Sequence, residues 1–298
     1  MKLNKYIALL IIVALFALVL SCESMGGIMQ IAAPIAQVAG VPGANLIAAY
    51  AKAFEEITPE QEYYIGRAVG ANVLGTYKLQ TNKPATTAYV NRIANALIIN
   101  SPRPEIFVGY HVGILDSDEI NAFATPGGHI FITRGLISCA TTEDTLASVI
   151  AHEIAHIQLQ HGLQAIKSGR RAEAFASTLS FAAEIKAGDS RFPELVRSFS
   201  DGVGEVVTTM MTKGYSRTQE YEADAEAMRL LSLAGYKPSS LLDMLRALER
   251  TQSSRPGGFN NTHPTPAQRI ENAQKEATRY NIPDTSAFRT ARFRTAVL

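Results

Sequence analysis

The chain has 298 residues, of which 47% are hydrophobic and 18% charged, and its formal net charge is +1. This composition excludes an intrinsically disordered chain and a collagen-like fibre. It also argues against nucleic acid as a partner, because the chain has almost no excess of positive charge to neutralise phosphates. Two cysteines are too few for a disulfide framework.

Residues 1–21 have the pattern of a lipoprotein signal peptide. Two lysines precede an apolar run over residues 6–20, which is shorter than the about 20 residues that a membrane-spanning helix needs. Ser21 and Cys22 follow and resemble the lipobox of bacterial lipoproteins, in which the cysteine is lipidated. Acyl chains on Cys22 would attach the protein to a membrane without spanning it. The alternative is a short apolar anchor that is not cleaved.

Residues 22–57 are predicted to form an uncharged tether, or else a loosely packed extension with no role at the membrane. No charged side chain occurs between Ser24 and Ala51, and glycines and prolines interrupt any long helix there. Glu23 takes the position at which an aspartate is associated with retention in the inner membrane. This favours the outer membrane, with the protein facing the periplasm.

The pattern after residue 57 predicts an α+β fold. An N-cap followed by proline indicates a helix over residues 59–79, and a second helix is expected over 85–100. Alternating residues at 106–110 and β-branched residues at 128–133 predict strands. Residues 141–278 are predicted to form helices joined by short loops. We therefore expect a mostly helical domain with a small antiparallel sheet.

The segment His152-Glu153-Ile154-Ala155-His156 carries the strongest chemical signal. A capping box at Thr141 and Asp144 predicts that it lies on one helix. Histidines four residues apart lie about 40° apart around a helix axis, so both imidazoles can bind one metal ion. Glu153 is placed to reach a water molecule on that ion. The apolar residues around the motif make a solvated histidine face the weaker interpretation.

Two histidines leave a catalytic zinc one protein ligand short. His161 lies about 140° around the helix from His156, and we expect it to interact with the negative helix end instead. The better third ligand is Glu220, in a helix that a second capping box opens at Ser216–Gln219. Asp224 shares its face and suits a carboxylate that orients a ligand histidine. Glu222 is expected to face solvent.

These motifs resemble the gluzincin zinc metallopeptidases of metallopeptidase family number forty-eight, which includes HtpX and the CAAX prenyl proteases. The similarity extends to Asn121–Ala124 and to His263-Pro264 followed by Arg269, and it covers roughly Thr58–Ala277. Within the family the chain is most similar to the outer-membrane forms BepA and LoiP, without the tetratricopeptide repeats of BepA. The resemblance implies a zincin-like fold whose edge strand flanks the active-site helix.

The resemblance also implies the roles of the site residues. One Zn²⁺ per chain would be bound by His152, His156 and Glu220, with Glu153 as the general base and Asp224 in support. The edge strand that pairs with extended substrate would comprise Asn121, Ala122, Phe123 and Ala124. The alternative for this strand is a plain hairpin connection.

Three residues are candidates for stabilising the oxyanion, and the sequence does not choose among them. They are His263, Arg217 and Arg269. The resemblance makes His263 a candidate for a removable fourth zinc ligand as well, and a loop-capping role is its alternative.

We thus expect four segments: a signal peptide (1–21), a tether (22–57), a zinc metallopeptidase domain (58–277) and a C-terminal tail (278–298). Helical residues within 163–214 are predicted to pack on the core rather than to form a movable lid. The function implied is a lipid-anchored, periplasm-facing zinc endopeptidase whose partners are misfolded, stalled or misassembled envelope proteins. A rival is a chaperone or assembly factor for outer-membrane proteins with a mainly structural zinc. Glu153 favours the enzyme, because a binding module needs no general base.

Overall fold

The computed structural model describes residues 56–168, 203–252 and 263–297. The chain divides into two units, and one of them, residues 1–57 with 166–195, lies almost wholly outside the described residues. The signal segment, Cys22, most of the tether and most of residues 163–214 therefore fall outside the description. The second unit, residues 58–165 with 196–298, carries the predicted chemistry.

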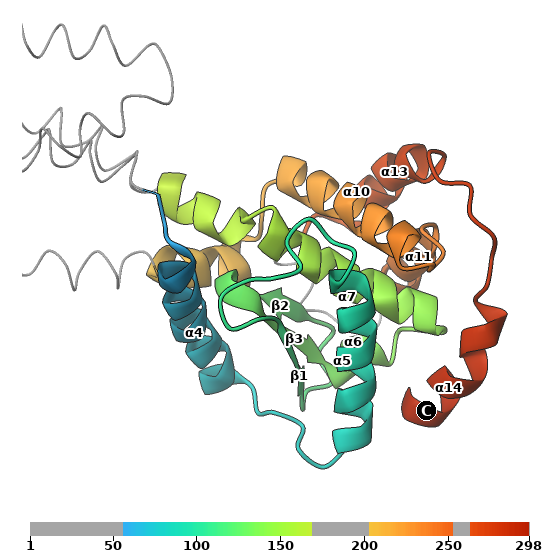
Figure 1. The fold of residues 1–298 in the computed structure, drawn as a ribbon, viewed down its shortest axis with the longest axis horizontal. Coiled ribbons are helices and arrows are strands. Elements are labelled where there is room, and N and C mark those ends of the chain that lie inside the picture. The colour runs from blue at the N-terminus through green and yellow to red at the C-terminus, as the bar shows by residue number, and fades with distance from the viewer. Residues whose placement is uncertain (1–55, 169–202, 253–262, 298) are drawn as a thin grey trace, which may run out of the picture. The chain divides into compact units, whose positions relative to one another are not determined.

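This second unit is mostly helical, as predicted, with one small sheet (Figure 1). Its helices are α4 (Pro59–Thr76), α5 (Pro84–Ile98), α6 (Arg134–Ile137), α7 (Glu143–Gln158), α10 (Arg217–Leu233), α11 (Ser240–Gln252), α13 (Pro266–Ala277) and α14 (Ala287–Val297). Its strands are β1 (His111–Leu115), β2 (Ala122–Ala124) and β3 (His129–Thr133), with short helical turns η1 (Pro126–Gly128) and η2 (Thr209–Lys213). Among the described residues, no helix is both long enough and apolar enough to span a bilayer.

The sheet has the order β1-β3-β2 and is mixed rather than wholly antiparallel. The turn η1 joins β2 to β3 as an antiparallel pair, whereas β1 lies on the other side of β3 and runs parallel to it. The prediction of a strand at residues 106–110 is wrong, because strand β1 begins at His111. The first helix also ends earlier than expected, at Thr76, and Leu79 forms a bridge to Leu115 of β1.

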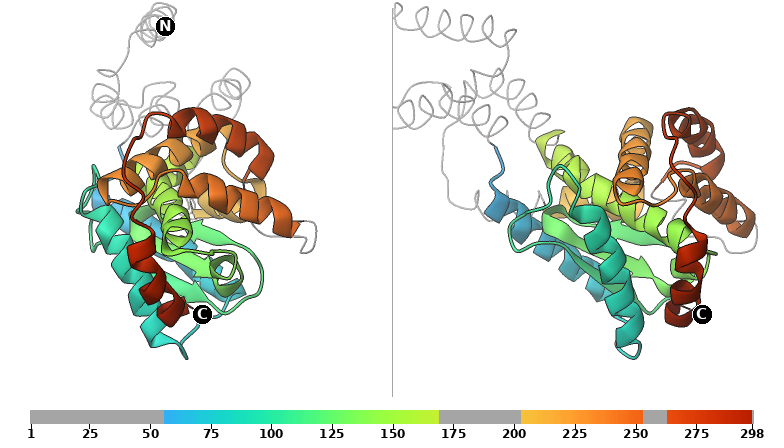
Figure 2. Two further views of the ribbon diagram at one scale, coloured as in Figure 1. Left: turned by 90° about the vertical axis from the view of Figure 1, so that its right-hand side faces the viewer. Right: turned by 45° about the vertical axis from the view of Figure 1, so that its right-hand side comes forward.

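Helix α7 is the centre of the unit. Every one of its residues is buried, and it lies between the sheet on one side and α10 on the other (Figures 1 and 2). Its N-cap is Thr142, which forms a capping box with Thr145, one residue after the predicted box. The large side chains of the surrounding core that are less than 2% exposed include Leu97, Ile114, Ile130, Ile132, Leu136, Leu146, Ile150, Ile154 and Phe293.

The turn η1 is fixed against α4 by two glycines. A Cβ on Gly66 would lie 1.7 Å from the Pro126 carbonyl oxygen, so α4 can approach the turn this closely only at a glycine. Gly127 has a φ of 69°, and a Cβ there would lie 2.6 Å from Tyr63 Cα. The end of β2 is therefore held in place by backbone contact.

Helix α14 closes over the start of α7. Phe293 is 1% exposed and belongs to the core. Arg289 donates two hydrogen bonds to the buried carboxylate of Asp144, at 2.9 and 2.7 Å. Arg292 pairs in the same way with Glu143. Two arginines of the last helix thus neutralise the two acidic residues that open the metal-motif helix.

Candidate metal centre

The two histidines of α7 converge on one point. His152 and His156 are each 1% exposed, and their Nε2 atoms lie 3.1 Å apart. The first glutamate of α10 completes the arrangement: Glu220 Oε2 lies 3.5 Å from His152 Nε2, and Glu220 Oε1 lies 3.6 Å from His156 Nε2. The structure therefore brings together the three ligands that the sequence predicted.

The two distances from Glu220 fit a small metal ion, and the 3.1 Å between the histidine nitrogens is slightly shorter than such an ion requires. Two bonds of about 2.0–2.2 Å at a tetrahedral angle place their donor atoms about 3.3–3.6 Å apart. Glu220 Oε2 is buried and accepts no hydrogen bond from any described residue, although Arg269 Nη1 lies at 3.5 Å from it. A buried carboxylate oxygen without a donor is costly, and a cation would compensate for it. The ligand atoms and the unsatisfied oxygen both favour a metal here.

The charge balance of the site points to a divalent ion. Three buried carboxylates, those of Glu153, Glu220 and Asp224, face one buried guanidinium, that of Arg269. With both ligand histidines neutral, as metal binding requires, a divalent cation would balance the remaining two negative charges. Burial raises the pKa of Glu220, but the nearby His263 and His152 rings outweigh it and hold the pKa well below its usual value. The side chain of Glu220 is therefore ionised at neutral pH and can bind a cation as a carboxylate.

The two ligand histidines differ in their surroundings. Burial and Arg269 lower the pKa of His152, but Asp224 and Glu220 outweigh them and raise it to about 9. Burial, together with His152, lowers the pKa of His156 well below its ordinary value. In the metal-free protein, His152 therefore carries a proton that a metal must displace, whereas His156 is neutral.

Glu153 is buried close to the metal-binding group, since the charges of His152, His263 and Glu220 all act on its carboxyl. Glu153 is 2% exposed, and its Oε1 atom has no hydrogen-bond partner among the described residues. Burial and the nearby Glu220 charge raise the pKa of Glu153, although His152 acts in the opposite direction. A carboxylate whose pKa is raised toward neutrality is suited to accept and return a proton.

Asp224 and Arg269 support the ligand shell. His152 Nδ1 lies 3.0 Å from Asp224 Oδ1, so the carboxylate can hold the proton-bearing nitrogen of that ring. Arg269, on α13, donates to both oxygens of Asp224 at 3.0 and 2.6 Å. Arg269 Nη2 also lies 3.2 Å from His152 Nδ1 and 3.4 Å from His152 Nε2, so Arg269 packs against the ligand histidine while it is bound to a carboxylate.

The other two oxyanion candidates occupy different environments. His263 is 7% exposed, and its Nδ1 lies 2.7 Å from Glu220 Oε1. Its ring nitrogen and the three ligand atoms all lie within 4.8 Å of one another. Arg217 is exposed on the first turn of α10. Of the three, only His263 joins the metal-binding group itself.

Strand β2 presents main-chain groups at the edge of the sheet. Asn121 pairs with Thr133, and Thr125 pairs with His129, through backbone hydrogen bonds to β3. Because hydrogen-bonded and non-hydrogen-bonded positions alternate in an antiparallel pair, the peptide groups of Ala122 face away from β3, as do those of Ala124. The Asn121 side chain accepts a hydrogen bond from the Ala122 N–H at 3.0 Å.

Three side chains near His156 make contacts that the sequence did not predict. His161 is fully buried, and its Nδ1 lies 2.8 Å from His156 Nδ1, so the predicted helix-end role is wrong. Glu222 has an exposed side chain, but one oxygen lies 3.3 Å from His161 Nε2. The ring of Tyr215 stacks on that of His156 at 4.2 Å between centroids. The only signals in the sequence were a histidine close after the motif and a second glutamate near Glu220.

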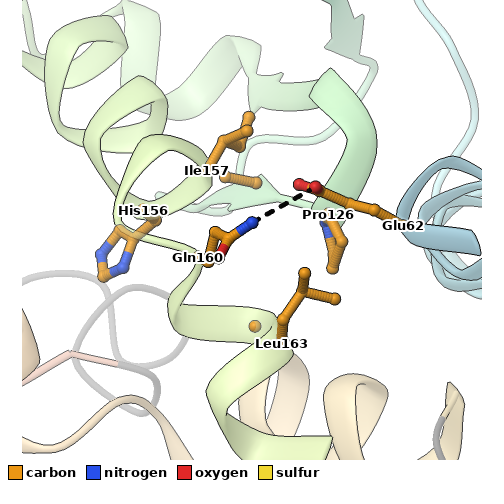
Figure 3. Close-up of a pocket in the computed structure, with 8 residues that line it drawn as sticks. Glu62, Pro126, His156, Ile157, Gln160 and Leu163 are labelled. Carbon is orange, nitrogen blue, oxygen red and sulfur yellow. Dashed lines mark hydrogen bonds between the residues drawn. The ribbon is translucent and has the colours of Figure 1, made fainter. Parts of the chain in front are cut away.

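A small pocket lies beside His156, at the end of α7 (Figure 3). Glu62 of α4 and Gln160 point toward each other across it, with a hydrogen bond of 3.5 Å, and the His156 ring points away from them. Glu62 also accepts a hydrogen bond from Arg103 at 3.0 Å. The pocket therefore flanks the metal-binding group. The Glu62 carboxylate in this pocket is already hydrogen-bonded to Gln160 and Arg103.

Comparisons with known proteins agree with this geometry. The sequence model described as Peptidase family M48 matches residues 84–277. The beta-barrel assembly-enhancing protease of Escherichia coli is 28% identical over 224 residues, which cover 72% of this chain and 42% of that protein. The metalloprotease LoiP of Escherichia coli is 29% identical over 196 residues, covering 64% of this chain and 71% of that relative.

A more distant relative is the mitochondrial metalloendopeptidase OMA1 of Schizosaccharomyces pombe, 25% identical over 226 residues, or 74% of this chain and 63% of that one. The chain spans less than half the length of the beta-barrel assembly-enhancing protease that it matches. The resemblance that the motifs indicated is confirmed by these matches.

Proposed function

Since the chain belongs to peptidase family M48, we propose that it is a zinc-dependent endopeptidase that hydrolyses unfolded proteins of the bacterial cell envelope. The observation that carries the proposal is the convergence of His152, His156 and Glu220 within zinc-ligand distances beside the buried carboxylate of Glu153. Nitrogen and carboxylate ligands in this number suit zinc with one position left for substrate or water.

The protein's own residues supply the proton transfers. A zinc ion held by the three ligands would lower the pKa of water toward about 7 and polarise the scissile carbonyl. Glu153 would accept the proton of the attacking water at Oε1 and deliver it to the leaving amine nitrogen. Asp224 keeps the ligand nitrogen of His152 directed at the site, because it holds the proton on Nδ1.

His263 is the best-placed side chain for the developing negative charge. Its Nδ1 lies 2.7 Å from Glu220 Oε1. Arg217 is exposed, and Arg269, although 3.4 Å from His152 Nε2, is engaged by both oxygens of Asp224. In that position it can act as a donor to the substrate or as a fourth ligand that leaves when substrate enters.

Substrate recognition through the main chain follows from strand β2. The peptide groups of Ala122 and Ala124 that face away from β3 would pair with an extended chain, as a further antiparallel or parallel strand, with the Ala122 N–H exchanging its Asn121 side-chain acceptor for the substrate. Such pairing depends little on side chains, so an unfolded protein of almost any sequence would be accepted. Ala124 and His156 both line the pocket at the end of α7, which places the edge strand next to the metal helix.

The cellular setting rests on the first residues and on the relatives. A lipobox-like Cys22 supports a lipid anchor in the outer membrane, with the catalytic unit in the periplasm. One relative is named for enhancing β-barrel assembly. Misassembled outer-membrane proteins are accordingly the substrates we propose, in a quality-control role.

The proposal is tested by comparing the wild type with Glu153→Gln. Glutamine keeps the size of the side chain and leaves all three ligands in place, so zinc content and melting temperature should be unchanged. It cannot take up the proton, so casein hydrolysis should fall by at least about 10²–10⁴-fold. Glu271→Gln, at an exposed ion pair with Lys275, is the control and should keep full activity. Full casein hydrolysis by Glu153→Gln would refute the assigned mechanism, and a chaperone would show no hydrolysis in either protein.

A further inference from the structure

A second histidine stands directly behind the ligand His156. Helix α7 ends at Gln158, and Gln160 takes a left-handed φ of 56°, which turns the chain before a new helical stretch begins at residue 161. His161 is thereby brought back toward α7, where it is fully buried, with Nδ1 2.8 Å from His156 Nδ1.

The direction of this hydrogen bond follows from the metal. His156 Nε2 faces His152 and Glu220 and must offer a lone pair, so the proton of His156 resides on Nδ1. His161 Nδ1 must then be the acceptor, which puts the proton of His161 on Nε2. That nitrogen lies 3.3 Å from a carboxylate oxygen of Glu222. The His156 proton is thus hydrogen-bonded to His161, and the His161 Nε2–H faces the Glu222 carboxylate in an ion-pair contact whose geometry falls short of a hydrogen bond.

The other ligand histidine, His152, is held by a carboxylate in a similar way. His152 meets the carboxylate of Asp224 directly, at 3.0 Å, whereas His156 reaches the carboxylate of Glu222 through one intervening imidazole. Both carboxylates belong to α10, the helix that also supplies Glu220. The stacked ring of Tyr215 limits rotation of His156 from its face, and His161 fixes it from its edge.

We infer that His161 and Glu222 are positioning residues that hold His156 in the tautomer and orientation required to bind the metal. This inference rests on the proposed metal site. Carboxylates and histidines that fix a ligand imidazole in this way commonly raise metal affinity by about 10–100-fold. His161 acts directly on the ligand, and Glu222 acts only through His161.

Zinc affinity of the purified full chain tests this, measured with zinc alone by competition against a chelator. His161→Ala should weaken zinc binding by about 10–100-fold. His161→Asn should recover most of the affinity, because its side-chain oxygen can accept the His156 Nδ1 proton. Glu222→Ala should have a smaller effect than His161→Ala, because its carboxylate is partly solvated. The double variant should bind no more weakly than His161→Ala alone, since the two residues act in series.

Two controls separate positioning from general damage. His111→Ala removes an exposed histidine of β1, and Glu271→Ala removes an exposed carboxylate, so both should keep wild-type zinc affinity. Melting temperatures of the metal-free proteins show whether His161→Ala still folds. If His161→Ala does not fold, Glu222→Ala provides the test, because the exposed side chain of Glu222 is not part of the core.

Wild-type zinc affinity in both His161→Ala and Glu222→Ala would overturn this inference while leaving the proposed metal site intact. A folded His161→Asn that binds as weakly as the alanine variant would also overturn it. Failure of the wild type to bind zinc would refute it together with the proposed function.

Discussion

Arg269 and Asp224 form a bidentate pair in the interior, with nitrogen–oxygen distances of 3.0 and 2.6 Å. Both residues are 1% exposed, so neither charge is compensated by water. The pair joins α13 to α10 directly behind His152, and it therefore ties the C-terminal helices to the metal-binding group.

Replacing Arg269 should be among the most damaging single changes outside the ligands. Arg269→Ala leaves Asp224 buried without its cation, which typically costs about 3–5 kcal/mol in the free energy of unfolding. Arg246→Ala removes one partner of the exposed ion pair with Asp243 and should cost about 0–1 kcal/mol. Denaturant unfolding of the metal-free proteins gives both values, and similar losses in the two variants would contradict the role of the buried pair.

Glu220 should be indispensable for metal binding. Glu220→Ala removes one of three protein ligands, so the purified variant should lose stoichiometric zinc. Glu226→Ala is the matched control on the same helix, because Glu226 pairs with Arg229 instead of facing the metal group. Metal analysis after dialysis distinguishes them. Full zinc content in Glu220→Ala would mean that another residue, with His263 the nearest candidate, completes the site.

The two phenylalanines of α14 should differ sharply in their contribution to stability. Phe293 is 1% exposed and belongs to the core, whereas Phe288 is 85% exposed. Phe293→Ala should cost about 3–5 kcal/mol because it leaves a cavity, and Phe288→Ala should change the free energy of unfolding by less than about 0.5 kcal/mol. Equal effects in thermal unfolding would show that α14 does not pack on the core in solution.

Glu143 should make the unit more stable above the ordinary pKa of a glutamate than below it. Burial raises the pKa of Glu143, but Arg292 and the hydroxyls of Tyr89 and Tyr236 outweigh it and lower the pKa below its ordinary value. A pKa that is lowered in the folded state stabilises the protein above the unfolded value of about 4.3, and this stabilisation is lost as the pH falls through the lower, folded value.

The measurement is the free energy of unfolding between about pH 6 and pH 3. The wild type should lose stability steadily on acidification, whereas Glu143→Gln should start lower and lose less over the same range. Glu271→Gln, at an exposed position, should follow the wild-type slope. Parallel curves for the wild type and Glu143→Gln would contradict the assignment.

The lipid anchor proposed at Cys22 is tested by metabolic labelling with palmitate. Cys22→Ser should abolish incorporation, because the acylated thiol is removed. Cys139→Ser is the natural control, since it removes the other cysteine of the chain and should keep the label. Equal labelling of Cys22→Ser and the wild type would refute lipidation of Cys22, and the absence of label from both would favour the uncleaved apolar anchor.

The sequence alone determined the parts of this site that depend on position within one helix. Four-residue spacing puts His152 and His156 on one face, and the capping box at Ser216 puts Glu220 and Asp224 on another, because helix geometry is regular and local. The N-cap and proline pattern likewise predicted where the first helix starts, since Thr58 is its N-cap and Pro59 its first residue. These inferences needed no knowledge of which helices meet.

Only the tertiary structure decided how these faces combine. The helical wheel placed His161 away from His156, but a left-handed residue at Gln160 ends the helix and brings His161 back to it. The parallel pairing of β1 with β3 and the closure of α14 over Glu143 and Asp144 join residues distant in the chain. A local pattern cannot encode such contacts, because they depend on the packing of several elements around one core, and a single backbone dihedral can redirect a side chain from one partner to another.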